Sequence, residues 1–228
     1  MKFLLALNLV ICCIATNAQK KNQYISVEIL SDYDSYSFKS NFNTTQIKEG
    51  LQGNGISSGL NFQYQKQVFK NWYFNFGAGY YNYKFSINRP FLYTGDFPNR
   101  LLYNTRKYTY NCISILVGTK YEKEVFKNLI WNIDLDYTYY YTLRQKYLLS
   151  INNSAEINKQ LFHFGNSINI STSLMKKIDN LSFGFQIRVP ILEYWRKDKI
   201  FKENPSESNH KFLGGFGLGL ICMYNLKR

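Results

Sequence analysis

Two aspartates spaced two residues apart are the strongest candidates for acid–base chemistry in this sequence. Asp134 and Asp136 would share one face of a strand, about 6.6 Å apart. That spacing falls within the roughly 5–9.5 Å range of glycosidase carboxylate pairs, but no sugar cleft is indicated beside them. Glu28 and Arg188 point to the same side by parity. We therefore predict that Glu28, Asp134, Asp136 and Arg188 form a buried ion network, because charges inside a narrow structure need partners.

One histidine motif has a counterpart in a known enzyme family. His163-Phe164-Gly165-Asn166 is similar to the His-x-Ser-Asn motif of lipid A deacylase barrels, but Gly165 stands where that family has its nucleophilic serine. Ser167 lies four residues from His163, about 13 Å along a strand, whereas a nucleophile and its base must approach to roughly 3 Å. We expect a hydrogen-bonded histidine inside the fold and no catalytic residues.

Neither the glycine-rich tail nor the cysteines indicate a cofactor or metal site. Residues 214–219 (GGFGLG) lack the Gly-x-Gly-x-x-Gly spacing and a following helix, so their alternate glycines are predicted to clear one face of a last strand. The histidines and cysteines are too scattered for a metal site. Cys112 and Cys222 are expected on opposite faces of different strands, beyond the ~7 Å Cα separation of a disulfide.

These residues would be positioned by strands, because alternation of apolar and polar residues recurs eight times. The apolar faces are Ile25-Val27-Ile29-Tyr33, Ile56-Leu60-Phe62-Tyr64, Trp72-Phe74-Phe76-Ala78-Tyr80, Ile113-Ile115-Val117-Tyr121, Trp131-Ile133-Leu135-Tyr137-Tyr139, Phe162-Phe164-Ile168-Ile170, Leu181-Phe183-Phe185-Ile187-Val189 and Phe216-Leu218-Leu220-Tyr224. Most are close to the ~9–11 residues of a tilted transmembrane strand. The opposite faces are small and polar, which suits a barrel lumen better than the apolar pocket of a soluble, lipocalin-like barrel.

Connections between these strands alternate in length. Short ones are predicted at 66–71, 122–128 and 175–180, and long ones at 34–55, 86–107, 143–160 and 193–211. Val-Phe-Lys-Asn occurs at 68–71 and 125–128 and is predicted to be a repeated hairpin turn. Outer-membrane barrels have short periplasmic turns and long external loops, so an even number of strands would leave both termini in the periplasm.

Aromatic residues are expected to form two interfacial belts, because amphipathic rings favour the boundary between lipid and water. Tyr64, Trp72, Tyr121, Trp131 and Tyr224 fall at the turn-side ends of the apolar faces, and Tyr33, Tyr80, Tyr139 and Phe162 fall at the loop-side ends.

The predicted export signal and the net charge limit the classes of molecule that the protein could bind. Residues 1–18 have the charged start, apolar run and small terminal residue of a cleaved signal peptide, which leaves 19–228 as the barrel domain. The net charge of +13 could indicate nucleic-acid binding, but export argues against it. Arg89, Arg100, Arg106 and Lys107 lie in the predicted loop 86–107 with one acidic residue, Asp96. They could bind lipopolysaccharide phosphates or simply keep the loop soluble.

Over residues 22–226 the pattern resembles the small Gram-negative outer-membrane barrel families: the OmpA transmembrane domain, OmpX and the PorT-like barrels. Gly219, Cys222 and Tyr224 match the glycine, hydrophobic and aromatic positions of their C-terminal assembly signal. The resemblance implies an eight-stranded antiparallel up-and-down transmembrane β-barrel, inserted in the outer membrane by the barrel assembly machinery. We expect a non-enzymatic envelope protein without a cofactor, which acts structurally or through its loops. The alternatives are a PorT-like secretion accessory and a lipid A-modifying enzyme.

Overall fold

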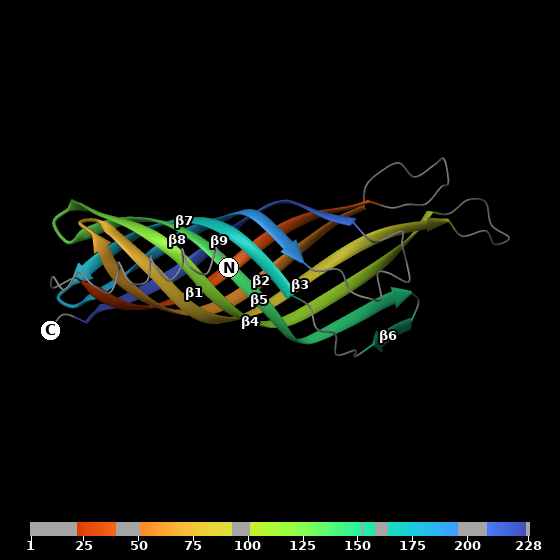
Figure 1. The fold of residues 1–228 in the computed structure, drawn as a ribbon. Coiled ribbons are helices and arrows are strands. Elements are labelled where there is room, and N and C mark those ends of the chain that lie inside the picture. The colour runs from red at the N-terminus through yellow and green to blue at the C-terminus, as the bar shows by residue number, and fades with distance from the viewer. Residues whose placement is uncertain are drawn as a thin grey trace, which may run out of the picture.

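A closed ring of eight strands is the core of the fold. The computed structural model describes residues 22–39, 51–92, 101–151, 153–157, 164–195 and 209–226, so the predicted signal peptide lies outside it. The strands are β1 (Gln23–Lys39), β2 (Leu51–Phe69), β3 (Trp72–Leu92), β4 (Leu101–Phe126), β5 (Leu129–Ile151), β6 (Asn153–Ile157), β7 (Phe164–Ile178), β8 (Leu181–Trp195) and β9 (Asn209–Asn225). Antiparallel ladders follow chain order from β1 to β5, continue through β7, β8 and β9, and return to β1. The predicted eight-stranded antiparallel barrel is confirmed (Figure 1). The short β6 pairs with the far end of β5.

The register of the ladders shows that the strands are tilted relative to the barrel axis. A row of paired residues starts at Trp72, crosses Tyr121, Ile133, Thr172, Ile187, Leu218, Ser31 and Ser58, and returns to β3 at Asn82, ten residues after its start. Closing an eight-stranded sheet with such a stagger tilts the strands and leaves an interior that side chains can fill.

The predicted apolar faces point out of the barrel. Ile29, Phe62 and Phe185 are 58%, 54% and 74% exposed, whereas the residues between such positions are mostly buried inside. A soluble barrel would place its apolar face inward, so this exterior contradicts the lipocalin-like alternative and is typical of contact with lipid. No helix among the described residues is long and apolar enough to cross a bilayer.

Three two-residue turns, at 70–71, 127–128 and 179–180, join strands at one end, which we call the turn end. Both predicted Val-Phe-Lys-Asn segments close on these turns, as expected. Asn128 and Asp179 adopt φ values of 64° and 53°, a left-handed conformation that Asn and Asp tolerate better than most residues. The Leu226 N–H donates to the Gln23 carbonyl at 2.8 Å, so both ends of the described chain lie at the turn end (Figure 1).

The predicted long connections are partly strand, which corrects their bounds. β3 runs to Leu92 and β4 begins at Leu101, inside the predicted loop 86–107, and β5 and β6 occupy much of 143–160. β1, β2, β8 and β9 likewise extend into 34–55 and 193–211. Outside a membrane a strand can be polar on both faces, so the apolar alternation stops while the backbone ladder continues. The wall therefore projects beyond the apolar band at the opposite end, the loop end (Figure 1).

The wall opens at one place near the loop end. The β8–β9 ladder ends where Arg188 faces Gly217, although β8 stays paired with β7 to Trp195 and β9 stays paired with β1 to Asn209. Figure 1 shows the two strands diverging. Pro190, which has no N–H to donate, lies two residues after Arg188 on β8.

Candidate functional site

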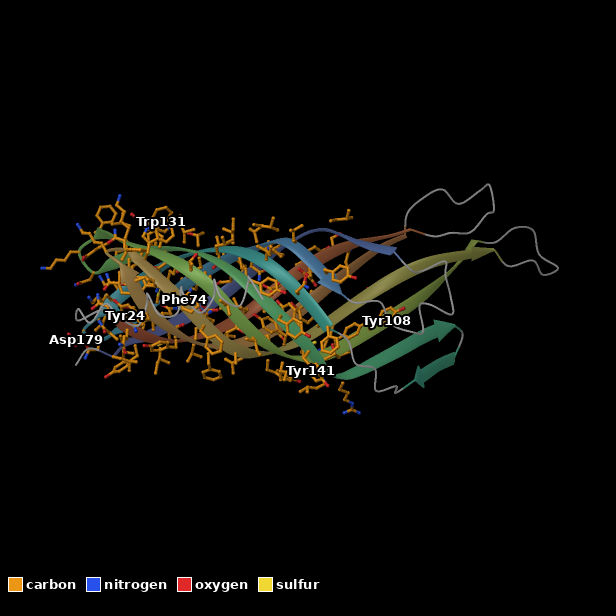
Figure 2. The ribbon with its side chains drawn as sticks, in the orientation of Figure 1. Tyr24, Phe74, Tyr108, Trp131, Tyr141 and Asp179 are labelled. Carbon is orange, nitrogen blue, oxygen red and sulfur yellow. The ribbon has the colours of Figure 1, made fainter. Side chains whose placement is uncertain are left out.

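Side chains fill the lumen in layers, and the layer at the turn end is apolar. Its members are Tyr24, Tyr73, Ile130, Met175, Ile221 and Met223, each at most 6% exposed. The Lys120 ammonium lies 5.0 Å from the centre of the Tyr73 ring and 3.4 Å from a carboxylate oxygen of Glu122. Figure 2 shows Tyr24 at this end of the barrel. The layer blocks the turn end of the lumen.

Buried carboxylates form the next layer, where amides hold two of them. Asn61 Nδ2 donates to Glu28 at 3.3 Å, and Asn75 Nδ2 donates to Asp134 at 3.2 Å. Asp136 is 7% exposed and points into the same lumen. Amide donors hold these two carboxyl groups in place, so the layer is built on hydrogen bonds to asparagines.

Arg188 links β8 across the lumen to β1 and β3. Its Nη2 forms an ion pair with Asp32, and its Nη1 donates to the Tyr81 hydroxyl at 2.8 Å. That hydroxyl also accepts a hydrogen bond of 2.8 Å from Asn61 Nδ2. Gly217 faces Asp32 in one ladder and Arg188 in the other, and any side chain there would collide with the Asp32 carboxylate. The alternate glycines of β9 therefore make room for lumen groups, as predicted.

Tyrosines fill the lumen towards the loop end. The rings of Tyr81, Tyr83 and Tyr140 pack with centres 5.4–5.8 Å apart, and Tyr140 is hydrogen-bonded to Ser167 at 3.1 Å. Tyr108 lies further along and is 3% exposed (Figure 2). The turn-end layer, the Arg188 cluster and these rings are thus buried at successive levels of the lumen.

The fold of the barrel has a solved counterpart. OprG, an outer membrane protein of Pseudomonas aeruginosa, matches with a TM-score of 0.52 at 8% identity, over 92% of this chain and 98% of that one. The fold is that of an eight-stranded outer-membrane barrel. Neisserial surface protein A (TM-score 0.40, 12% identity, 87% and 96% coverage) and Ail of Yersinia pestis (0.40, 10%, 91% and 100%) also match. No protein-family model and no curated protein sequence matches. At these identities the likeness concerns the fold alone.

In this outer-membrane-type barrel the four predicted network residues all face the lumen, but their contacts differ from the prediction. Arg188 pairs with Asp32, which is not a member of the predicted network, while Glu28 and Asp134 accept hydrogen bonds from asparagines. No described ion pair joins the four to one another. Parity could have found Asp32, which alternates with Glu28. It could also have found Lys120, which alternates with lumen-facing Ser114 and Leu116.

Every belt residue within the described part faces outward. Tyr64, Trp72, Trp131 and Tyr224 are 36–48% exposed towards the turn end with Tyr121 beside them, and Tyr80 and Tyr139 lie towards the loop end. Figure 2 shows Trp131 at the turn end, where its Nε1 donates to Thr172 at 2.8 Å. Tyr33 is outward too, and Phe162 lies outside the described residues. Their role as interfacial belts stays a prediction.

The remaining candidates show no catalytic arrangement among the described residues. Ser167 is hydrogen-bonded to Tyr140 and Asn169, and His163 lies outside the described residues. Cys112 is buried and Cys222 is exposed, and both are free, which confirms the prediction of unpaired cysteines. No three potential metal ligands come together in the described ranges.

Proposed function

We propose that this protein is an integral outer-membrane barrel with a plugged lumen, which acts structurally or through its loop-end surface and performs no catalysis. One observation carries the proposal: an apolar exterior surrounds a lumen filled with side chains. Aqueous channels belong to barrels of about sixteen strands, whereas eight strands leave an interior only wide enough for side chains. The turn end with both termini would face the periplasm, in line with the short turns of bacterial barrels.

The plugged lumen predicts negligible conductance. Purified wild-type protein in planar bilayers should show no stable open state, because the turn-end layer and the Arg188 cluster block the interior. A general porin in the same chamber serves as the positive control. A steady wild-type conductance of porin size would contradict the plugged lumen and favour a transport function.

The proposed orientation predicts which sites are labelled at the cell surface. In a Cys112→Ser, Cys222→Ser background, Asp96→Cys lies in the connection between β3 and β4, and Lys127→Cys lies in a turn. A membrane-impermeant maleimide should label the first in intact cells and the second only after lysis. Surface labelling of Lys127→Cys would reverse the orientation, and labelling of neither before lysis would argue against outer-membrane placement.

A further inference from the structure

On the outer surface of β3, β4 and β5, the last row of the apolar band towards the loop end consists of three side chains. Tyr80, Ile113 and Tyr141 are paired across the two ladders, and Tyr80 and Ile113 are 46% and 45% exposed. The next row consists of Asn82, which is hydrogen-bonded to Asn111, and Arg144 beside it. The change from apolar to polar takes place within about one step of the ladder, about 7 Å along the strands. Exposed Leu143, at the register shift on β5, lies between the two rows.

Three exposed cations lie just beyond this boundary, and we call them the basic face: Lys84 on β3, Lys107 on β4 and Arg144 on β5. Lys84 faces Thr109, and Lys107 is two residues along the same strand from Thr109, so the two lysines are diagonal neighbours. The Cβ atoms of such neighbours are about 7–8 Å apart. A register shift between Asn111 and Cys112 brings Arg144 opposite outward-facing Asn111.

One acidic residue shares the register of this face, because Glu156 of β6 pairs with Leu148, which in turn pairs with Lys107. In the loop half, Asp32 and Asp34 are buried in the lumen, and Glu193 lies opposite lumen-facing Ser167 in the β7–β8 ladder. The described ion pairs include none of the three cations. The three cations therefore outnumber the one acidic residue, and the two neighbouring lysines repel each other, which a bound anion relieves.

We propose that the basic face binds the phosphate groups of a glycolipid in the outer leaflet, of the lipid A type, with its acyl chains against the apolar wall below. This inference rests on the proposed outer-membrane placement and names a partner for it. Basic side chains form strong charge-assisted bonds with phosphate. The tyrosine-bearing row directly beneath the cations selects an amphiphile over a free anion, because one molecule can then satisfy both surfaces.

The basic face takes one residue from the predicted loop 86–107. That residue is Lys107, which is exposed on the outer surface of β4. Lys84 and Arg144, which lie on the neighbouring strands, complete the face.

The test titrates refolded, detergent-solubilised full-length barrel with diphosphoryl lipid A in mixed micelles and measures affinity by thermophoresis. The triple variant Lys84→Gln, Lys107→Gln, Arg144→Gln should bind on the order of 100-fold more weakly, given the usual contribution of each basic residue at an anionic surface. Lys70→Gln, Lys123→Gln, Lys127→Gln removes the same charge from exposed turn-end positions and should change affinity less than about threefold. Wild-type protein should bind dephosphorylated lipid A as weakly as the first variant binds the phosphorylated form.

Equal losses in the two triple variants would overturn the proposal, since net charge alone would then set the affinity. Equal wild-type affinity for phosphorylated and dephosphorylated lipid A would also overturn it, and this comparison decides the matter if the first variant fails to fold. Displacement of lipid A by millimolar inorganic phosphate would assign the face to a free anion. These measurements use purified protein, so their failure leaves the plugged lumen intact, whereas a porin-like conductance would refute the proposed function without changing lipid A affinity.

Discussion

Replacement of Arg188 by alanine should destabilise the barrel by about 3–5 kcal/mol, the usual cost of removing one partner from a buried ion pair. Arg188 and Asp32 are 6% and 3% exposed, so the Asp32 carboxylate would stay buried without its cation. Tyr81 would lose a donor to its hydroxyl as well.

Urea unfolding of the refolded barrel in detergent, followed by heat-modifiable gel mobility, measures this loss. Arg144→Ala is the matched control, because Arg144 is exposed on the outer surface and should cost less than about 0.5 kcal/mol. Adding Asp32→Asn to Arg188→Ala should restore part of the stability by removing the unpaired charge. Equal stability of Arg188→Ala and Arg144→Ala would show that the pair does not hold the lumen together.

Gly217→Trp should sharply lower the yield of folded, membrane-inserted barrel. A side chain at this position collides with the Asp32 carboxylate, and Arg188 faces the same residue from β8. Overpacking of a filled interior costs about 1–3 kcal/mol, and disruption of the Asp32–Arg188 pair adds to that cost.

Leu218→Trp provides the control one residue away. Leu218 is 57% exposed on the outer surface, where a large ring meets lipid instead of the lumen. Both variants introduce a tryptophan, which points into the lumen at position 217 and towards lipid at position 218. Quantification of heat-modifiable protein in the membrane fraction should show near wild-type yield for Leu218→Trp and a severalfold loss for Gly217→Trp. Equal yields would mean that the assigned facing of β9 is wrong.

The alternation of residue types was enough to predict the membrane-facing part of the fold. Ile29, Phe62 and Phe185 point outward because lipid contact imposes a strict period of two on the apolar residues. No such constraint acts on residues 101–110 of β4, where water can contact the outer face. That segment has the composition of a loop, and only the backbone ladder with β3 and β5 makes it a strand.

The contacts between lumen side chains were harder to predict than whether each side chain points into or out of the barrel. Parity correctly placed Glu28, Asp134, Asp136 and Arg188 inside, but the contact of Arg188 with Asp32 depends on which strands are neighbours after closure and on their stagger. Both follow from the ring as a whole and from no single strand. A list of inward residues therefore leaves many pairings open until the register of every ladder is known.

The β1–β9 ladder has a consequence for the timing of folding. It pairs Tyr24 with Asn225, so the ring closes between segments at opposite ends of the described chain, and contacts of such separation form slowly. Until the 17 residues of β9 dock, β1 and β8 each present an unpaired backbone edge, and every unsatisfied group in hydrocarbon costs several kcal/mol. A seven-stranded intermediate therefore has no stable place in the bilayer. We therefore expect stable insertion to require the pairing of β9 with both β1 and β8.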